Sequence, residues 1–180
     1  MTQPVALTIA GSDPSGGAGV QADLKVFQQY KVYGTAVISL LTVQNTKNVY
    51  QVKTLAADFV KAQLDAVLDD IPPLAAKTGA LGSREVIEAI SQMAEYFTFP
   101  LVVDPVLISK HGARLLEPSA EVSLKDKLLP WAFLLTPNIP EAEAISGVKI
   151  RGIDEITRAA EKIINLGAKH VLIKGGHLEE

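Results

Sequence analysis

The 180-residue chain contains no cysteine, so disulfides and thiolate metal sites are excluded. It has only three histidines, which are far apart and lack a metal-ligand spacing such as His-Glu-x-x-His: His111, His170 and His177. The 17 lysines and arginines are scattered, without the cluster that nucleic-acid binding usually shows. We therefore expect neither a metal bound by cysteine or histidine nor a nucleic-acid partner.

Long apolar runs are also missing. The first basic residue is Lys25, so the N-terminus lacks the positive region of a signal peptide, and the apolar residues 5–10 are too few for its apolar segment. The richest apolar stretch, residues 36–41, falls far short of the roughly 18 residues that a membrane span requires. These absences predict a cytoplasmic protein with no membrane partner.

Composition and pattern predict one domain over residues 1–180. Hydrophobic residues make up 48% of the chain and charged residues 21%, which is enough to bury one sizeable core. Six strand-like apolar runs alternate with helical periodicity: residues 6–10, 36–42, 74–76, 101–103, 133–135 and 170–173. This alternation predicts an α/β fold with a mostly parallel sheet covered on both faces by helices.

Apolar residues at helical spacing predict three helices, over residues 58–71, 83–97 and 154–166. Asp58 is expected to cap the first of them, and Gly167 to close the third. Residues 48–55 are expected to form a further strand or a flap at the edge of the sheet.

A glycine-rich turn follows the first predicted strand, within LTIAGSDPSGGAGVQADLK, and leads into a helix whose first turn is expected to carry Asp23. Glycines leave backbone N–H groups unshielded, so such a turn can hold a small polar ligand against a helix N-terminus. Hydrogen-bonding side chains surround the same opening: Asp13, Ser15, Gln21 and Asp23. The alternative is that a tight crossover from strand to helix requires glycines for its own geometry.

Residues 17–22 also satisfy the G-x-G-x-x-A form of dinucleotide-binding turns. That fold expects an acidic residue about 20 positions later, yet no Asp or Glu occurs between Asp23 and Asp58. The phosphate-binding pattern G-x-x-x-x-G-K-[ST] is absent, because no lysine follows Gly16 or Gly17. Dinucleotide binding therefore stays a minor alternative.

Polar residues follow each predicted strand, at the edge where open parallel sheets bind their ligands. Asp104 and Glu141 are hard oxygen ligands suited to Mg²⁺, and Asn138 adds an amide. Lys174 is expected to offset phosphate charge. Taken singly, the structural alternatives are favoured, since Asn138 can cap a helix and Glu141 can offset its dipole.

Together these residues suit phosphoryl transfer, in which catalysis is mostly positioning and neutralisation of phosphate charge. Near the glycine turn, Asp23 and Gln44 offer a carboxylate and an amide to the hydroxyl, amino and ring-nitrogen groups of a small heterocycle. The sequence therefore predicts one site that holds a heterocycle beside a metal-bound phosphate.

Several segments carry a family resemblance: LTIAGSDPSGGAGVQADLK, LTVQNT, KTGALGS, VVDPV, LLTPNIPEAE and VLIKGGH. Together they resemble hydroxymethylpyrimidine/phosphomethylpyrimidine kinases of thiamine biosynthesis, members of the ribokinase-like superfamily. The resemblance implies a three-layer αβα sandwich and transfer of the ATP γ-phosphate to hydroxymethylpyrimidine and then to its monophosphate. It also makes a homodimer the expected assembly.

The resemblance assigns roles to individual residues. Five residues are expected around the pyrimidine: Gly11, Ala18, Asp23, Gln44 and Val106. Four are expected to face Mg²⁺ and the phosphates of ATP, Asp104 and Glu141 as metal ligands and Asn138 and Lys174 as nucleotide contacts. No residue is assigned as catalytic, because the segment that supplies the family's anion hole and cysteine is absent.

Two departures from the family pattern keep alternatives open. Ala80 stands where the family usually has methionine, which widens the expected pocket and admits pyridoxal or pyridoxine kinase as an alternative. The later GTGC-type stretch is missing before the chain stops at Glu180, so the C-terminal part of the fold is expected to be missing. Donors of an anion hole can each contribute about 10²- to 10³-fold in rate, so a non-catalytic binding module or fragment is the other alternative.

Overall fold

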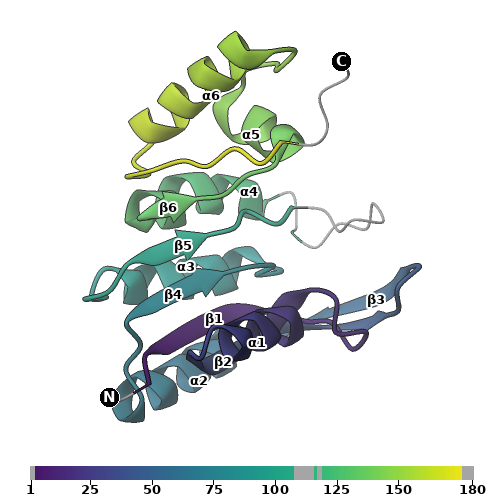
Figure 1. The fold of residues 1–180 in the computed structure, drawn as a ribbon, viewed down its shortest axis with the longest axis vertical. Helices are drawn as coiled ribbons and strands as arrows, with labels where there is room; N and C mark the ends of the chain where they lie inside the picture. The colour runs from purple at the N-terminus through teal and green to yellow at the C-terminus, as the bar shows by residue number, and fades with distance from the viewer. Residues whose placement is uncertain (1–2, 108–115, 117–118, 176–180) are drawn as a thin grey trace.

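A six-stranded sheet forms the centre of the computed structural model, which describes residues 3–107, 116 and 119–175 (Figure 1). The strand order is β3-β2-β1-β4-β5-β6. The strands are β1 (Val5–Ser12), β2 (Tyr33–Gln44), β3 (Val49–Thr54), β4 (Ala75–Thr78), β5 (Leu101–Val103) and β6 (Leu134–Leu135). All neighbouring pairs are parallel except β2 with β3. The predicted mostly parallel sheet is confirmed, and residues 48–55 contain its antiparallel edge strand.

Helices cover both faces of this sheet. They are α1 (Gly19–Gln29), α2 (Ala57–Asp70), α3 (Arg84–Ala94), α4 (Ala120–Ser123), α5 (Ile139–Ser146) and α6 (Ile153–Asn165), with a π-helical turn over Leu124–Leu128 and a 3₁₀ turn over Leu129–Trp131. α1 packs on β1 and β2 from one side, whereas α2 packs on β2 from the other and contacts α3, which contacts α4 (Figure 1). The predicted α/β class is therefore confirmed.

Helix starts differ from the predictions at two acidic residues. Ala56 rather than Asp58 is the N-cap of α2, and Asp58 lies in the first turn, where a carboxylate favours the helix dipole. Because α1 begins at Gly19, no acidic residue lies in its first turn and Asp23 falls in the second. Ser83, the first residue of the helix predicted over residues 83–97, is the N-cap of α3 and accepts a hydrogen bond from the Val86 N–H.

Two regions were predicted incompletely. Residues 170–173 were predicted as a strand, but the segment makes only isolated bridges, from Val171 to Leu135 in β6 and from the following Lys174 to Asn138. Residues 120–131 are helical although no helix was predicted there. The buried residues Ala120, Leu124 and Leu128 are spaced by four, which is the signal that indicates this helix.

The core lies on both sides of the central strands, so the sequence of β1 is a near-continuous apolar run. Leu7 and Ile9 of β1, Val37 of β2 and Leu128 and Leu129 of the helical turns are fully buried. In the described part of the chain, no helix has the length and apolar character needed to cross a bilayer.

Thr78 at the end of β4 is fully buried, and its Oγ1 is the one buried side-chain polar atom of the described residues without a hydrogen-bond partner. Replacing Thr78 with valine keeps the shape and removes the unsatisfied hydroxyl, so the free energy of unfolding should rise by about 1 kcal/mol. Urea unfolding measures this change. Thr35→Val is the control, because the Thr35 hydroxyl donates to the Ala6 carbonyl. The free energy of unfolding of this variant should not rise. A loss of stability in Thr78→Val would contradict the prediction.

Candidate active site

The glycine-rich turn between β1 and α1 is organised by a buried carboxylate of the protein itself. Asp13 is 4% exposed and accepts hydrogen bonds from the Ser15 N–H at 2.8 Å, the Ser15 hydroxyl at 2.7 Å, the Gly17 N–H at 3.1 Å and the Ala18 N–H at 2.9 Å. The Gly17 N–H was among the glycine N–H groups predicted to be open to a ligand, and Ala18 is its neighbour in the turn. Both N–H groups are instead bonded to Asp13, so this turn shapes a pocket wall rather than offering these two groups to an anion.

These hydrogen bonds also set the charge state of Asp13. Burial by itself raises the pKa of this carboxyl, but the bonds from the Ser15 hydroxyl and from the backbone of Ser15, Ala18 and Gly17 outweigh burial and hold the pKa below its usual range. Gln21 completes the arrangement by accepting from the Asp13 N–H at 2.9 Å and donating to the Ser12 hydroxyl at 2.7 Å. Gln21 is therefore a support of the turn.

A pocket of about 500 Å³ opens at the carboxyl ends of the parallel strands. Its walls come from the glycine turn, the start of α1, the end of β2 and the segments after β4 and β5. All five residues predicted to surround a heterocycle line it: Gly11, Ala18, Asp23, Gln44 and Val106. Asp104 lines the same pocket, so the predicted heterocycle and metal-phosphate ends meet at one opening.

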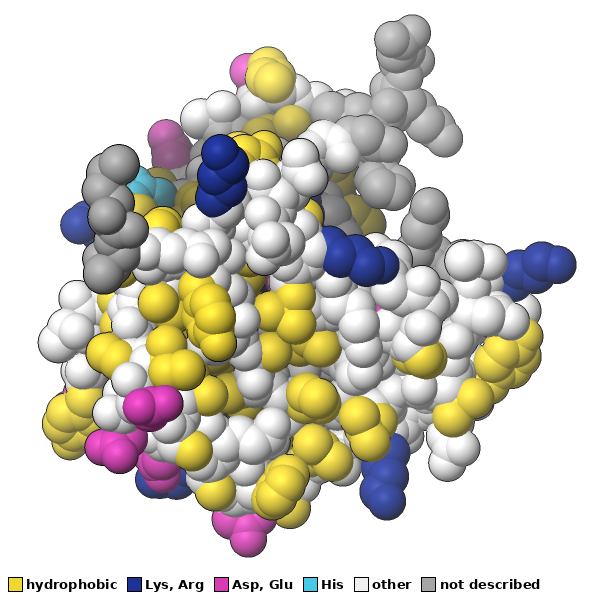
Figure 2. Space-filling view, turned by 60° about the horizontal axis from the view of Figure 1, so that its bottom comes forward, with side chains coloured by type: hydrophobic (Ala, Val, Ile, Leu, Met, Phe, Trp, Pro, Cys, Tyr) yellow, Lys and Arg dark blue, Asp and Glu magenta, His cyan; other side chains and the backbone are white. Residues whose placement is uncertain are grey.

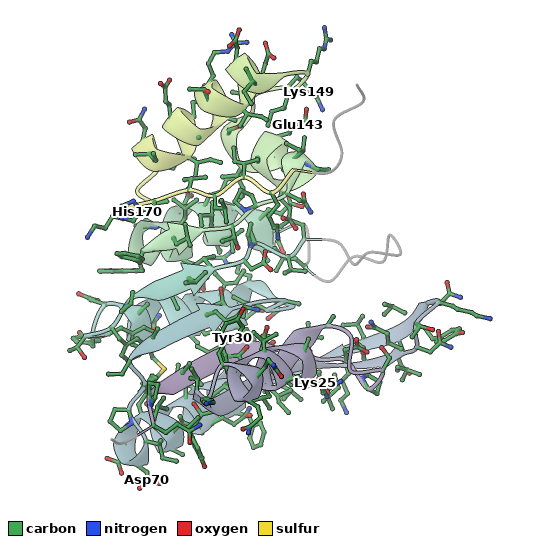
Figure 3. The ribbon with its side chains drawn as sticks, viewed as in Figure 1. Lys25, Tyr30, Asp70, Glu143, Lys149 and His170 are labelled. Atoms are coloured by element: carbon green, nitrogen blue, oxygen red, sulfur yellow. The ribbon has the colours of Figure 1, made fainter. Side chains whose placement is uncertain are left out.

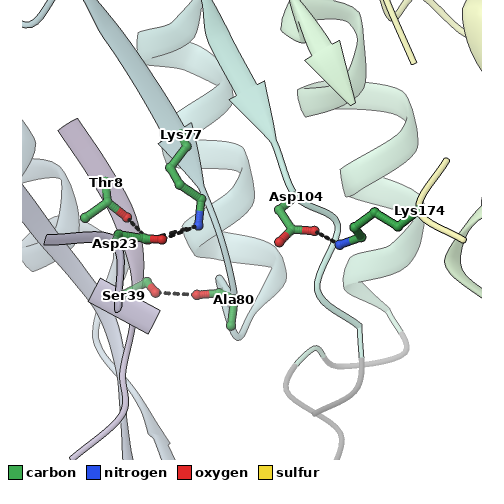
Figure 4. Close-up of polar contacts among 7 residues, drawn as sticks. All are labelled: Thr8, Asp23, Ser39, Lys77, Ala80, Asp104 and Lys174. Carbon is green, nitrogen blue, oxygen red and sulfur yellow. Dashed lines mark hydrogen bonds and ion pairs between the residues drawn. The ribbon is translucent and has the colours of Figure 1, made fainter. Parts of the chain in front are cut away.

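Asp23 enters this pocket as part of an ion-paired network (Figure 4). Its carboxylate accepts from the Thr8 hydroxyl at 2.6 Å and from the Lys77 ammonium at 2.9 and 3.1 Å. The network joins α1 to β1 and β4, which are neighbours in the sheet. Thr8 was not predicted to lie at the site, and Lys77 was counted among the polar residues at this edge of the sheet without a role. Both lie on the same sheet face because they are paired in register.

Ala80 also lines the pocket, in the loop after β4. Its carbonyl accepts a hydrogen bond of 2.6 Å from the Ser39 hydroxyl, which is buried in β2 (Figure 4). This bond holds the backbone of the loop in place while the methyl side chain leaves space above it. The position where the sequence departs from its family pattern is therefore part of the pocket.

A second ion pair lies beyond β5. The ammonium of Lys174 is 2.9 Å from Asp104 Oδ1, and the Lys174 N–H donates to the Pro137 carbonyl at 2.7 Å (Figure 4). That backbone bond and the bridge to Asn138 hold the segment next to β6. Lys174 does not line the pocket itself but neutralises the carboxylate that does.

Asn138 and Glu141 form a capping box at the start of α5. The Asn138 side chain accepts from the Glu141 N–H at 2.9 Å, and the Glu141 carboxylate accepts from the Asn138 N–H at 2.8 Å. Neither residue lines the pocket. Glu141 is 5% exposed, and burial raises the pKa of its carboxyl above the usual range, with Asp104 adding to the rise and Lys174 opposing it. Glu141, Asp104 and Lys174 therefore interact electrostatically at one end of the site.

The donor set fits only one mode of magnesium binding. Among residues 3–107, 116 and 119–175, no group of three or more acidic or histidine side chains could hold a metal. Mg²⁺ usually binds through one or two carboxylates together with waters and substrate phosphates. Asp104 and Glu141 fit this shared mode, in which the nucleotide supplies the remaining oxygens.

The raised pKa of Glu141 predicts that its ionisation lowers the free energy of unfolding. The folded chain holds the Glu141 proton more tightly than the unfolded chain, so stability falls as pH rises through the raised pKa. Glutamine keeps the capping hydrogen bond and removes the buried charge, so Glu141→Gln should raise the free energy of unfolding by about 1 kcal/mol near pH 7 and by less at pH 4. Urea unfolding at both pH values tests this.

Glu143, on the same helix, supplies the matched control (Figure 3). The Ile150 N–H and the Lys149 side chain hold its pKa below the usual range, so its charge stabilises the fold at neutral pH. Glu143→Gln should therefore lower stability at pH 7. Equal signs for the two variants would show that the burial of Glu141 does not control its contribution.

The protein is an α/β sandwich whose pocket lies at the carboxyl ends of its parallel strands, and acidic and basic side chains lie at one end of that pocket. This arrangement is that of a small-molecule kinase of the ribokinase-like class. A crystal structure of phosphomethylpyrimidine kinase from Clostridium difficile 630 superimposes with a TM-score of 0.92 and 50% identity, covering 99% of this chain and 78% of that one. A pyridoxal kinase from Staphylococcus aureus in complex with AMP-PCP gives a TM-score of 0.88 at 37% identity, covering 99% of this chain and 66% of that one.

The sequence places the chain within this class. A family profile described as phosphomethylpyrimidine kinase matches residues 13–180. The hydroxymethylpyrimidine/phosphomethylpyrimidine kinase of Bacillus subtilis is 45% identical over 176 residues, which are 97% of this chain and 65% of that protein. The chain belongs to the phosphomethylpyrimidine kinase family, and it spans about two thirds of the length of this curated relative.

Proposed function

We propose that this protein transfers the γ-phosphate of ATP to the hydroxymethyl group of hydroxymethylpyrimidine and then to its monophosphate, as a step of thiamine biosynthesis. The observation that carries the proposal is the single pocket that holds both Asp23 and Gln44, suited to a heterocycle, and Asp104, suited to the phosphate end. Membership of the family and the AMP-PCP complex of the related pyridoxal kinase support the same reaction class.

At the heterocycle end, shape and hydrogen bonding orient the alcohol. Gly11 and Ala18 present small surfaces that leave room for a flat ring, and Val106 adds an apolar contact. The Asp23 carboxylate accepts from an amino group, and the Gln44 amide both donates and accepts. These contacts would direct the hydroxymethyl group toward Asp104.

At the phosphate end, Asp104 and Glu141 would hold Mg²⁺, while Asn138 and Lys174 would contact the nucleotide. Mg²⁺ held there would neutralise the negative charge of the phosphates. Lys174 adds positive charge beside Asp104 at 2.9 Å, and the capping box keeps Glu141 fixed. These residues position phosphate groups rather than exchange protons with them.

A phosphotransfer assay tests the proposal. The protein is incubated with γ-³²P-labelled ATP, Mg²⁺ and hydroxymethylpyrimidine or its monophosphate, and labelled products are separated; calorimetry measures binding of each pyrimidine to the same protein. Label is expected in both products. Binding without transfer would favour the non-catalytic module. The absence of both binding and transfer would refute the substrate class.

Pyridoxal is the second candidate substrate, because Ala80 lines the pocket and pyridoxal kinases are among the solved structures that match. Comparing kcat/KM for hydroxymethylpyrimidine and pyridoxal decides between them. Ala80→Met would narrow the pocket, so it should reduce activity toward the larger pyridoxal more than toward the pyrimidine. A higher kcat/KM for pyridoxal in the unaltered protein would overturn the first choice.

The β2–β3 hairpin is the surface that we propose for a homodimer. β3 is an edge strand, and Leu41, Val43 and Tyr50 on this hairpin are 42%, 55% and 63% exposed. Figure 2, which views the end of the molecule where α1 and α2 lie, shows hydrophobic side chains in several patches and Lys and Arg side chains at separate places. Light scattering after size-exclusion chromatography should give twice the monomer mass, and Val43→Asp should give the monomer mass.

A cytoplasmic location stays a prediction of the sequence.

A further inference from the structure

Lys77 is the only lysine, arginine or histidine among the residues that line the pocket in the described part of the chain. Three carboxylates line the same pocket: Asp13, Asp23 and Asp104. Asp13 is enclosed by hydrogen bonds from its own turn. The charge that a ligand meets is therefore set mainly by Asp23 and Asp104 and by the cation between them.

The sheet register explains why Lys77 lies between these two carboxylates. Lys77 of β4 is paired with Thr8 of β1 on one side and with Val102 of β5 on the other, so the three side chains share one sheet face. Asp104 follows β5, two residues after Val102, and lines the same pocket as Lys77. Across neighbouring elements, the side chains thus alternate in charge from Asp23 to Lys77, Asp104 and Lys174 (Figure 4).

Lys77 has capacity left for a ligand. An ammonium group carries three donors, and its described partners are the two oxygens of Asp23 alone, at 2.9 and 3.1 Å. Asp23 is held independently by the Thr8 hydroxyl at 2.6 Å. The Lys77 side chain is 26% exposed, which leaves its charge accessible from the pocket.

We infer that Lys77 determines whether the pocket can hold an anionic, phosphorylated alcohol as well as the neutral one, an inference that rests on the proposed function. Without Lys77, a phosphomonoester would enter a pocket in which Asp13 is enclosed by its own turn and, of the other two carboxylates, only Asp104 has a cationic partner. A neutral alcohol carries no formal charge, so its electrostatic repulsion from the carboxylates is small. Lys77 therefore acts as a specificity-determining residue for the second phosphorylation substrate.

Calorimetry on the unaltered chain, Lys77→Met and Lys77→Arg at pH 8 tests the inference with two probes, hydroxymethylpyrimidine and phosphomethylpyrimidine. Lys77→Met should weaken binding of the phosphorylated probe by about 10- to 100-fold and of the alcohol by less than about threefold. Lys77→Arg keeps the charge and should stay within about threefold for both. Lys25→Met is the control, because Lys25 of α1 donates to the Gly16 carbonyl and does not line the pocket (Figure 3). In this variant the ratio of the dissociation constants of the two probes should not change.

Asp23→Asn provides a reciprocal test that does not depend on the folding of Lys77→Met. Removing the negative charge beside Lys77 should shift the ratio of dissociation constants at least about threefold toward the phosphorylated probe. Equal losses for both probes in Lys77→Met, or no shift in Asp23→Asn, would overturn the role of Lys77 while leaving the substrate class intact. Failure of the unaltered chain to bind either probe would refute the substrate class and this inference together.

Discussion

Replacing Gly19 with alanine should lower the free energy of unfolding by about 3 kcal/mol and weaken pyrimidine binding by at least about tenfold. Gly19 has a φ of +58°, in the left-handed region that a residue with a side chain rarely adopts. A Cβ atom at this position would collide with the Gly11 carbonyl oxygen and lie 3.3 Å from the Asp13 nitrogen. Backbone, rather than a flexible side chain, would therefore have to move.

That movement would reach the pocket directly, because Gly11, Asp13 and Gly19 all line it. Gly17→Ala is the matched control, since a Cβ there meets only Asp13 Oδ2 at 3.8 Å and the φ is not positive. Urea unfolding and calorimetric binding should show a small change for Gly17→Ala and a large one for Gly19→Ala. Similar effects of the two variants would show that the close approach at Gly11 does not shape the pocket.

The sheet and its ligand-binding edge could be predicted because both depend on local patterns. Apolar runs mark the parallel strands, and the polar residues after them must meet at one edge. Asp23, Gln44 and Asp104 therefore came together as predicted, although they are distant in sequence. Their role as ligands of substrate and metal stays a prediction.

The pairing of polar groups could not be predicted, since sequence shows which groups can bond but not which do. Lys77 reaches Asp23 across a sequence separation of 54, which only the packing of α1 on the sheet determines. In the glycine turn, Asp13 accepts a hydrogen bond from the Gly17 N–H, which was predicted to be open to a ligand. For Glu141 the sequence allowed either a place in the first helical turn, where it offsets the dipole, or a role as metal ligand. The structure places it in the first turn and adds the capping bond, and the role as metal ligand stays a prediction.

The second large effect concerns the Asp13 carboxylate, which links the stability of the pocket wall to pH. Asp13→Asn should lower the free energy of unfolding by about 2 kcal/mol at pH 7, because an amide cannot accept on both sides and the hydrogen bonds from the turn to a charged acceptor are lost. It should also weaken pyrimidine binding, since the turn that Asp13 holds includes Ala18.

The pH dependence distinguishes a loss of charge from a loss of shape. The folded pKa of Asp13 lies below its unfolded value of about 3.9, so the ionised carboxylate stabilises the fold above that pH, and this stability disappears as pH falls through the folded pKa. Urea unfolding should thus show a constant gap between Asp13→Asn and the unaltered chain from pH 5 to 8 and a narrower gap below pH 4. Asp65→Asn, which breaks an exposed pair with Lys61, should change stability by less than about 1 kcal/mol. A gap that widens on acidification would mean that hydrogen bonds to the ionised Asp13 do not hold the turn.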